Sequence, residues 1–214
     1  LATRKHSQIC LGALGPNLPE LIGGSADLTH SNYTDIKGET GSFQAETPEK
    51  RYLHFGVREH AMAAITNGIT LHSNLIGYAS TFLVFSDDMR PSIRLAALMN
   101  INSVFIFTHD SIFVGEDGPT HQPVEHLMSY RAIPNLLVLR PSDANEAVEA
   151  CKIAFEQKEH PSFVLLTRQG LPVLDRTKYA SYDSVYKGGY IISDCNDKPD
   201  VLIFATGSEV WVSL

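Results

Sequence analysis

Short apolar runs alternate with longer helical patterns along most of the chain, and this alternation limits its possible folds more than any other feature. The apolar runs lie at 21–22, 52–54, 75–78, 104–107, 136–139 and 163–166. The helical patterns cover 1–14, 59–71, 85–98, 124–130 and 143–155. Such alternation is typical of a parallel sheet whose consecutive strands are joined by helices. The sequence therefore predicts an α/β fold with a mostly parallel six-stranded sheet and helices on both faces.

Length and composition suit one sizeable domain with a buried core, because 43% of the 214 residues are apolar. The formal net charge is −7 and the arginines are scattered, so we expect no nucleic-acid partner. No apolar run approaches the roughly 20 residues that cross a bilayer, and the first residues lack a secretory pattern. We therefore expect a soluble protein that is not secreted and has no membrane partner.

The three cysteines, Cys10, Cys151 and Cys195, are far apart in the sequence, and their spacing matches no metal-ligand pattern. An odd number of isolated cysteines is typical of reduced thiols. This predicts a reducing compartment, either the cytoplasm or the stroma of a plastid.

A glycine-rich loop at 109–123 carries the most chemistry, with His109, Asp117 and His121 close together in the sequence. The loop follows the apolar run 104–107, so its first residues should lie beyond the carboxyl end of a strand, where open α/β sheets bind ligands. Histidine suits proton transfer near neutral pH. Metal binding is the weaker interpretation because the ligand spacing is wrong, and we expect no metal site.

This loop strongly resembles the corresponding segment of transketolases, thiamine-diphosphate enzymes that move two-carbon ketol units between sugar phosphates. Four further landmarks stand in the order of that family: Arg4 in Ala-Thr-Arg-Lys, Gly-Gly-Ser-Ala-Asp-Leu-Thr at 23–29, His-Phe-Gly-Val-Arg-Glu-His-Ala-Met at 54–62, and Arg168 in Leu-Thr-Arg-Gln. The resemblance covers nearly the whole chain. Several ordered motifs make it far more specific than a single glycine-rich pattern would be.

The resemblance implies the middle, pyrimidine-binding domain of a transketolase, with the three-layer thiamine-diphosphate-binding fold, over 1–170. A linker at 171–199 and a truncated start of the C-terminal domain at 200–214 would follow, and 201–209 reads as strand, turn and helix opening. In the family an N-terminal domain, absent from this chain, binds the diphosphate together with Mg²⁺ or Ca²⁺. The active site forms between the two subunits of a homodimer. We expect this chain alone to be inactive.

Three candidate residues concern the pyrimidine ring of the cofactor. On spacing alone, Glu59 could simply interact favourably with the dipole of its helix, and Phe82 and Phe85 could simply pack in the core. The resemblance implies that Glu59 hydrogen-bonds the aminopyrimidine ring and shares a proton with it, which requires a buried carboxyl group. It also implies that the two phenylalanines form the pyrimidine slot.

The remaining candidates concern the substrate. By resemblance, Arg4, Ser31 and Arg168 bind the substrate phosphate, although a solvated arginine is the ordinary alternative. His109 and His121 would act near the sugar carbonyl and first hydroxyls, and Asp117 would contact a further hydroxyl. His109 also matches a residue near the cofactor, as does Asp27. The alternative for Asp27 is a capping or turn-forming role.

Two residues depart from the family pattern. Phe113 stands where glycine is usual, and Asp88 stands where an aromatic residue flanks the slot. Phenylalanine does not tolerate a positive φ, so either the loop shifts or the benzyl group points away. These two residues are the only support for a non-catalytic module of the same fold. Deoxyxylulose-phosphate synthase and the β-subunit of 2-oxoacid dehydrogenases share this domain type, but the loop and the arginines favour transketolase.

Overall fold

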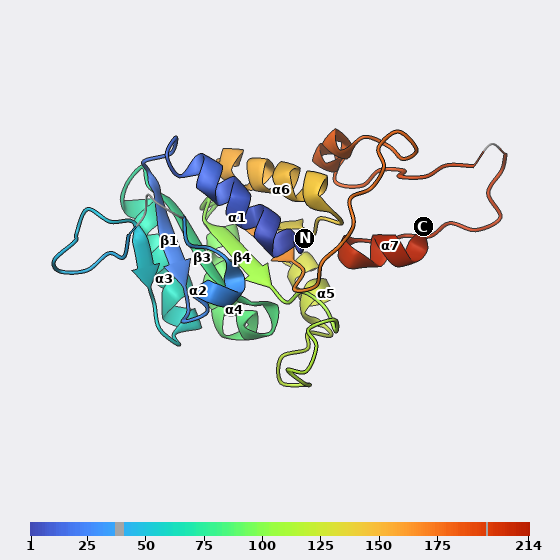
Figure 1. The fold of residues 1–214 in the computed structure, drawn as a ribbon. Helices are drawn as coiled ribbons and strands as arrows, with labels where there is room; N and C mark the ends of the chain where they lie inside the picture. The colour runs from blue at the N-terminus through green and yellow to red at the C-terminus, as the bar shows by residue number, and fades with distance from the viewer. Residues whose placement is uncertain (37–40, 196) are drawn as a thin grey trace.

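Six strands form one sheet in the order β2-β1-β3-β4-β6-β5 in the computed structural model, which describes residues 1–36, 41–195 and 197–214 (Figure 1). The strands are β1 (Leu21–Ser25), β2 (Tyr52–His54), β3 (Ile76–Phe82), β4 (Val104–Thr108), β5 (Leu137–Leu139) and β6 (Ser162–Leu166). Every pairing among them is parallel. The predicted six-stranded sheet is confirmed.

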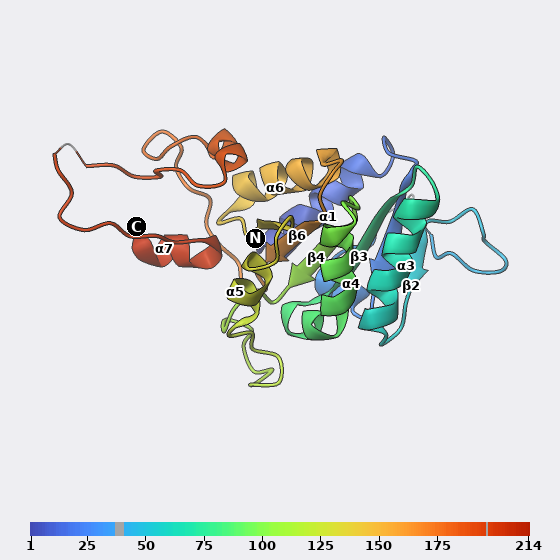
Figure 2. The same cartoon turned by 180° about the vertical axis from the view of Figure 1, so that it is seen from behind.

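Helices cover both faces of the sheet, as predicted. Helices α1 (Thr3–Leu14) and α6 (Ala144–Glu156) lie on one face, and α3 (Glu59–His72) and α4 (Ser86–Leu98) lie on the other (Figures 1 and 2). The central strand β4 serves both layers, because Phe105 and Phe107 join the core under α3 and α4 whereas Val104 and Ile106 join the core under α1 and α6. Burial on both faces explains why β4 reads as a continuous apolar run.

Several predicted boundaries shift. The 3₁₀ helix η1 (Leu83–Phe85) precedes α4, so Phe82 is the last residue of β3, not part of a helix. The pattern at 124–130 forms the short helix α5 (His126–Arg131). The polar loop at 25–50 contains a helix that the sequence did not predict, α2 (Thr29–Asn32), while 37–40 lie outside the described residues.

The predicted linker packs against the domain rather than running free. The 3₁₀ helix η2 (Tyr182–Lys187) lies on α6, and the Tyr186 hydroxyl is 3.3 Å from Glu156 Oε2. Asp143 is the N-cap of α6, and it accepts hydrogen bonds from the backbone N–H of Glu146 at 2.9 Å and of Leu174 at 3.0 Å. The same carboxylate that caps α6 thus also holds the segment around Leu174 at the start of the helix.

The strand predicted within 201–209 does not form. Residues 201–206 form no regular secondary structure and pair with no strand in the described part of the chain, and Val201, Leu202, Ile203 and Phe204 are each at least 68% exposed. A strand needs a neighbour for its backbone groups. The predicted turn and helix opening are present as η3 (Gly207–Glu209) and α7 (Val210–Ser213).

Two further predictions bear on the environment of the chain. All three cysteines are free thiols, as predicted. No helix in the described part of the chain is long and apolar enough to cross a membrane.

Candidate functional site

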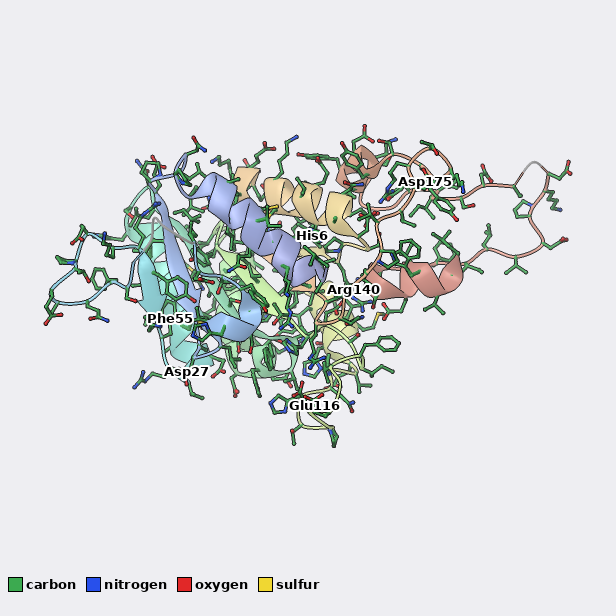
Figure 3. All side chains as sticks on the ribbon, viewed as in Figure 1. His6, Asp27, Phe55, Glu116, Arg140 and Asp175 are labelled. Atoms are coloured by element: carbon green, nitrogen blue, oxygen red, sulfur yellow. The ribbon has the colours of Figure 1, made fainter. Side chains whose placement is uncertain are left out.

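The predicted site residues gather at the carboxyl end of the sheet. Phe82 ends β3, His109 directly follows β4, and Arg168 follows β6. The hydroxyl of Thr81, near the end of β3, donates to Glu59 Oε1 at 3.4 Å. Glu59 and His109 therefore lie at the same end of the sheet, as the sequence predicts. Figure 3 shows Asp27, after β1, and Glu116, in the loop after β4, toward this same end.

Glu59 is the first residue of α3, and it is only 8% exposed. Its position in the first turn lets the N-terminal end of the helix stabilise a negative charge, as the simpler interpretation has it. Its burial, however, is what proton sharing with a ligand would require. The position and burial of Glu59 are thus compatible with both interpretations, and its role toward a cofactor stays a prediction.

An aromatic cluster stands beside the end of β3. The rings of Phe82 and Phe85 are nearly parallel, with centroids 5.9 Å apart and planes 11° apart. The His109 ring stacks on Phe82 at 3.6 Å, and His121 meets Phe85 edge-on at 5.3 Å. The cluster brings together four predicted site residues. The two phenylalanines achieve this from the strand end and η1, so the predicted shared helix face is wrong.

His109 is buried in the left-handed region, with φ 59°, and its Nδ1 lies 2.9 Å from the Thr108 hydroxyl. Burial lowers its pKa from 6.5 to about 3, and the positive charges of Arg4 and Arg168 act in the same direction. The imidazole is therefore neutral near pH 7. It can donate or accept a hydrogen bond, but it does not carry a proton into the site as a cation.

Titration of His109 checks this neutral state. In the full-length protein the ¹³Cε1 signal of His109, assigned with His109→Gln, should not titrate between about pH 8 and about pH 5. Arg4→Gln should raise the pKa of His109, because it removes a positive charge, whereas Lys5→Gln should leave it unchanged. Because the pKa of His109 is lower in the folded state, the stability that depends on its neutral ring is fully present above pH 6.5. This stability is lost as the pH falls toward about 3. A wild-type midpoint near 6.5 would contradict the prediction.

Two arginines border the aromatic cluster. Arg4 Nη1 donates to the carbonyl oxygen of Ser31 at 2.6 Å, and its guanidinium lies 5.0 Å from the Tyr33 ring centroid. Burial lowers the pKa of Arg4, and the nearby charge of Arg168 contributes to this lowering. Two guanidinium groups close enough to repel each other form a favourable setting for an anion. Ser31 contributes through its carbonyl here, so a phosphate contact by its hydroxyl stays a prediction.

The acidic candidates lie at the rim. Asp27 is exposed, with φ 60°, in the turn after β1. Asp117 is exposed in the loop after β4, and its charge reaches Arg4. Glu116 lies in the same loop, and its Oε2 is 3.7 Å from Nη2 of Arg168, which follows β6. These carboxylates and the arginine are accessible to a ligand.

Both departures from the family pattern have a structural outcome. Phe113 is 50% exposed and does not adopt a positive φ, so it causes no strain in the loop. Asp88 is exposed on α4, and its backbone carbonyl lies 3.2 Å from His60 Nδ1. Neither residue intrudes on the stack of Phe82 and Phe85.

Sequence reasoning missed two buried polar networks. The Asn32 side chain donates to the hydroxyls of Ser25 and Ser80 and accepts from Thr108, which ties the ends of β1, β3 and β4 together. Arg140 joins Asp110 to Glu209. Single polar residues carry no periodic signal, so only the adjacency of Asp110 to His109 could have drawn attention to the second network.

A group of potential metal ligands, Asp87, Glu125 and His126, also comes together, from α4 and the start of α5. His126 Nε2 lies 3.1 Å from Asp87 Oδ2, and both carboxylates are exposed. A hydrogen bond between the His126 ring and the Asp87 carboxylate accounts for this arrangement. The expectation that the chain has no metal site stays a prediction.

The family described as "Transketolase, pyrimidine binding domain" matches residues 1–173. A transketolase of Aquifex aeolicus is 53% identical over 214 residues, which cover all of this chain and 31% of that protein. A chloroplastic transketolase of Craterostigma plantagineum is 53% identical over 215 residues, with 99% of this chain and 41% of that protein covered. The crystal structure of a Pichia stipitis transketolase in complex with sedoheptulose 7-phosphate superposes with a TM-score of 0.93 at 47% identity, over 100% of this chain and 32% of that one. The chain thus spans about a third of the length of these relatives.

Proposed function

The chain belongs to the transketolase family through its pyrimidine-binding domain, and from this premise we propose that the full-length protein is a thiamine-diphosphate-dependent transketolase. It would transfer a two-carbon ketol unit from a ketose phosphate to an aldose phosphate. The observation that carries the proposal is the buried carboxyl group of Glu59 at the same sheet edge as the parallel Phe82–Phe85 stack. The high identity to transketolases along the chain favours this reaction over those of the related thiamine enzymes.

The residues present suit the pyrimidine end of the cofactor. Phe82 and Phe85 would line the site of a neutral heteroaromatic ring with apolar surface, and the buried Glu59 would supply a carboxyl group. Thiamine diphosphate, when bound, supplies a carbon nucleophile that attacks the ketose carbonyl group. Glu59 would hold a proton at the ring nitrogen that it faces. Asp27, at the turn after β1, would lie near the cofactor.

Histidines and arginines would hold the sugar phosphate. The neutral His109 would hydrogen-bond the sugar carbonyl oxygen or first hydroxyl, and His121, edge-on to the same stack, would act beside it. Asp117 would accept a hydrogen bond from a further hydroxyl. Arg4 and Arg168 would bind the phosphate through charge-assisted bonds, together with Ser31.

Phosphate recognition gives a sharp test, because the substrate can be varied as well as the protein. Purified full-length protein should transfer ketol units from xylulose 5-phosphate to an aldose phosphate. Arg168→Met should raise KM for xylulose 5-phosphate about 10- to 100-fold, since a charge-assisted bond is worth about 1.5 to 3 kcal/mol. KM for unphosphorylated xylulose should change little, and Arg94→Met, at an exposed position on α4, should change neither value. Equal effects on both substrates would assign Arg168 a structural role, and a wild-type protein without transfer activity would refute the proposed function.

The wider assembly forms part of the same proposal. An N-terminal domain would bind the diphosphate with Mg²⁺ or Ca²⁺, and the active site would form between the subunits of a homodimer in the cytoplasm or a plastid stroma. Residues 1–170 would form the pyrimidine-binding domain, 171–199 the linker, and 200–214 the start of the C-terminal domain. The 214-residue chain alone would be inactive, since it holds only one end of the cofactor.

A further inference from the structure

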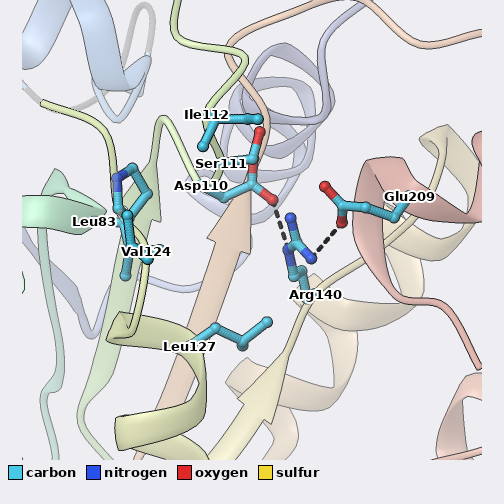
Figure 4. A pocket seen from close by; sticks show the side chains of 9 residues that line it. Leu83, Asp110, Ser111, Ile112, Val124, Leu127, Arg140 and Glu209 are labelled. Carbon is cyan, nitrogen blue, oxygen red and sulfur yellow. Dashed lines mark hydrogen bonds and ion pairs between the residues drawn. The ribbon is translucent and has the colours of Figure 1, made fainter. Parts of the chain in front are cut away.

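Arg140 connects two parts of the chain that are distant in sequence. Its Nε donates to Asp110 Oδ2 at 2.8 Å, and its Nη1 lies 2.5 Å from Glu209 Oε2. Figure 4 shows the two carboxylates on either side of the guanidinium. All three side chains line a cavity of about 250 Å³. The side chains of Arg140 and Asp110 are 7% and 1% exposed, so this is a buried interaction and not a surface ion pair.

Residues 206–209 pack closely against Arg140. Arg140 Nη1 donates to the Thr206 carbonyl at 3.2 Å, and the Gly207 N–H donates to the Arg140 carbonyl at 3.2 Å. Gly207 has φ +60°, and a Cβ atom at this position would lie 2.7 Å from Arg140 Nε. Only glycine combines this backbone conformation with so close an approach. The 206–209 segment is therefore seated specifically on Arg140.

At the other end of the interaction, Asp110 directly follows His109. A residue other than glycine at φ 59° is strained, and it stays in this conformation only where its surroundings fix it. On one side Thr108 is anchored by its hydroxyl, which donates to Asn32 Oδ1 at 3.1 Å. On the other side the only described side-chain partner of Asp110 is Arg140. The setting of His109 thus depends on both neighbours.

Charge adds to the geometric argument. Burial raises the pKa of the Asp110 carboxyl group, and the charge of Arg140 acts against this rise. Burial lowers the pKa of Arg140, but Asp110 and Glu209 together more than offset this and raise it. The buried charges of Asp110 and Arg140 are therefore each costly without the other. Glu209 itself repels Asp110, so the 206–209 segment acts on Asp110 through its contacts with Arg140 Nη1, which fix the position of the Arg140 side chain.

We propose that Arg140 is a positioning residue for His109, and that it couples the seating of the 206–209 segment to the geometry of the candidate site. The chain matches about a third of the length of its relatives, and 200–214 is the predicted start of a further domain. The coupling therefore joins the following part of the protein to His109. Its effect on turnover rests on the proposed function, whereas its effect on His109 itself does not.

The experiment uses the full-length protein with three variants and one control. Arg140→Lys keeps the charge but cannot span both carboxylates, Gly207→Ala lifts the segment without changing any charge, and Glu209→Gln is a mild change at a partly exposed side chain. The control is Arg94→Lys, because Arg94 lies at an exposed position on α4 and has no side-chain hydrogen bond or ion pair among the described residues. Two measurements are independent of activity: amide hydrogen exchange of peptides covering 108–112, and the rate at which diethyl pyrocarbonate modifies His109.

Arg140→Lys and Gly207→Ala should accelerate both exchange at 108–112 and modification of His109, and Glu209→Gln should do so more weakly. In turnover, Arg140→Lys should lower kcat about 10- to 100-fold with little change in KM, because misplacing a catalytic group costs rate more than binding. Wild-type exchange and reactivity in both Arg140→Lys and Gly207→Ala would overturn the proposal, as would equal acceleration by Arg94→Lys. A wild-type protein without ketol transfer would refute the proposed function, and the two activity-independent measurements would still decide the role of Arg140.

Discussion

Glu59→Gln should lower kcat of the full-length protein by about 100- to 10,000-fold, the range expected when a positioned acid or base is lost. Glutamine has nearly the same shape, so it can occupy the first turn of α3 without disturbing the core around it. Its amide cannot release and regain a proton as the carboxyl group can. Steady-state kinetics with xylulose 5-phosphate would measure the effect, and the protein should remain folded.

Thr81→Val is the matched control for this prediction. It removes the hydroxyl that donates to Glu59 Oε1 at 3.4 Å but leaves the carboxyl group in place. A hydrogen bond of this length contributes little, so kcat should fall by less than about tenfold. Near-normal turnover in Glu59→Gln, with thiamine diphosphate bound as tightly as in the wild type, would contradict the proton role of Glu59.

The sheet was predictable because burial on both faces leaves a continuous apolar run in the sequence, as in β4. The position of Glu59 at a helix start was predictable for a similar local reason. The neutral state of His109 was not, because its low pKa results from burial together with Arg4 and Arg168, which lie far from it in the sequence. Sequence reasoning assigned His109 the ordinary pKa of histidine, whereas burial in the fold lowers this pKa and keeps the ring neutral near pH 7.

The unpredicted parts share one physical cause, namely partners that are remote in sequence. The run at 201–205 has strand composition but no neighbouring strand among the described residues, so local propensity alone could not decide its structure. The capping interaction between Asp143 and Glu146 is local, and such patterns can be recognised in a sequence. The additional partners of Asp143, Leu174 and Arg176, come from the segment interpreted as a free linker.

Asp143→Ala should destabilise the packing of the 171–190 segment on α6 by about 3 to 5 kcal/mol, as expected when one partner of a buried ion pair is removed. The Asp143 side chain is fully buried, and its Oδ2 lies 3.1 Å from Arg176 Nη2. Arg176 would keep Glu146 at 3.5 Å as its remaining nearby carboxylate. The helix start would also lose its cap, which contributes about 1 kcal/mol of the total. Amide hydrogen exchange of peptides from 144–150 and 171–176 in the full-length protein would measure the local free energy of opening.

Asp143→Asn separates the charge from the cap. Asparagine can still accept from the Glu146 N–H through its side-chain oxygen, so the cap should survive while the ion pair with Arg176 is lost. Its effect should therefore be smaller than that of alanine. Asp175→Ala is the surface control, because Asp175 is exposed and, among the described residues, its side chain bonds within its own turn. It should leave the opening free energy nearly unchanged. If Asp143→Ala opened the 171–176 peptides no faster than Asp175→Ala did, the segment would be held by its other contacts, such as that of Tyr186 with Glu156, and the anchoring role of Asp143 would be wrong.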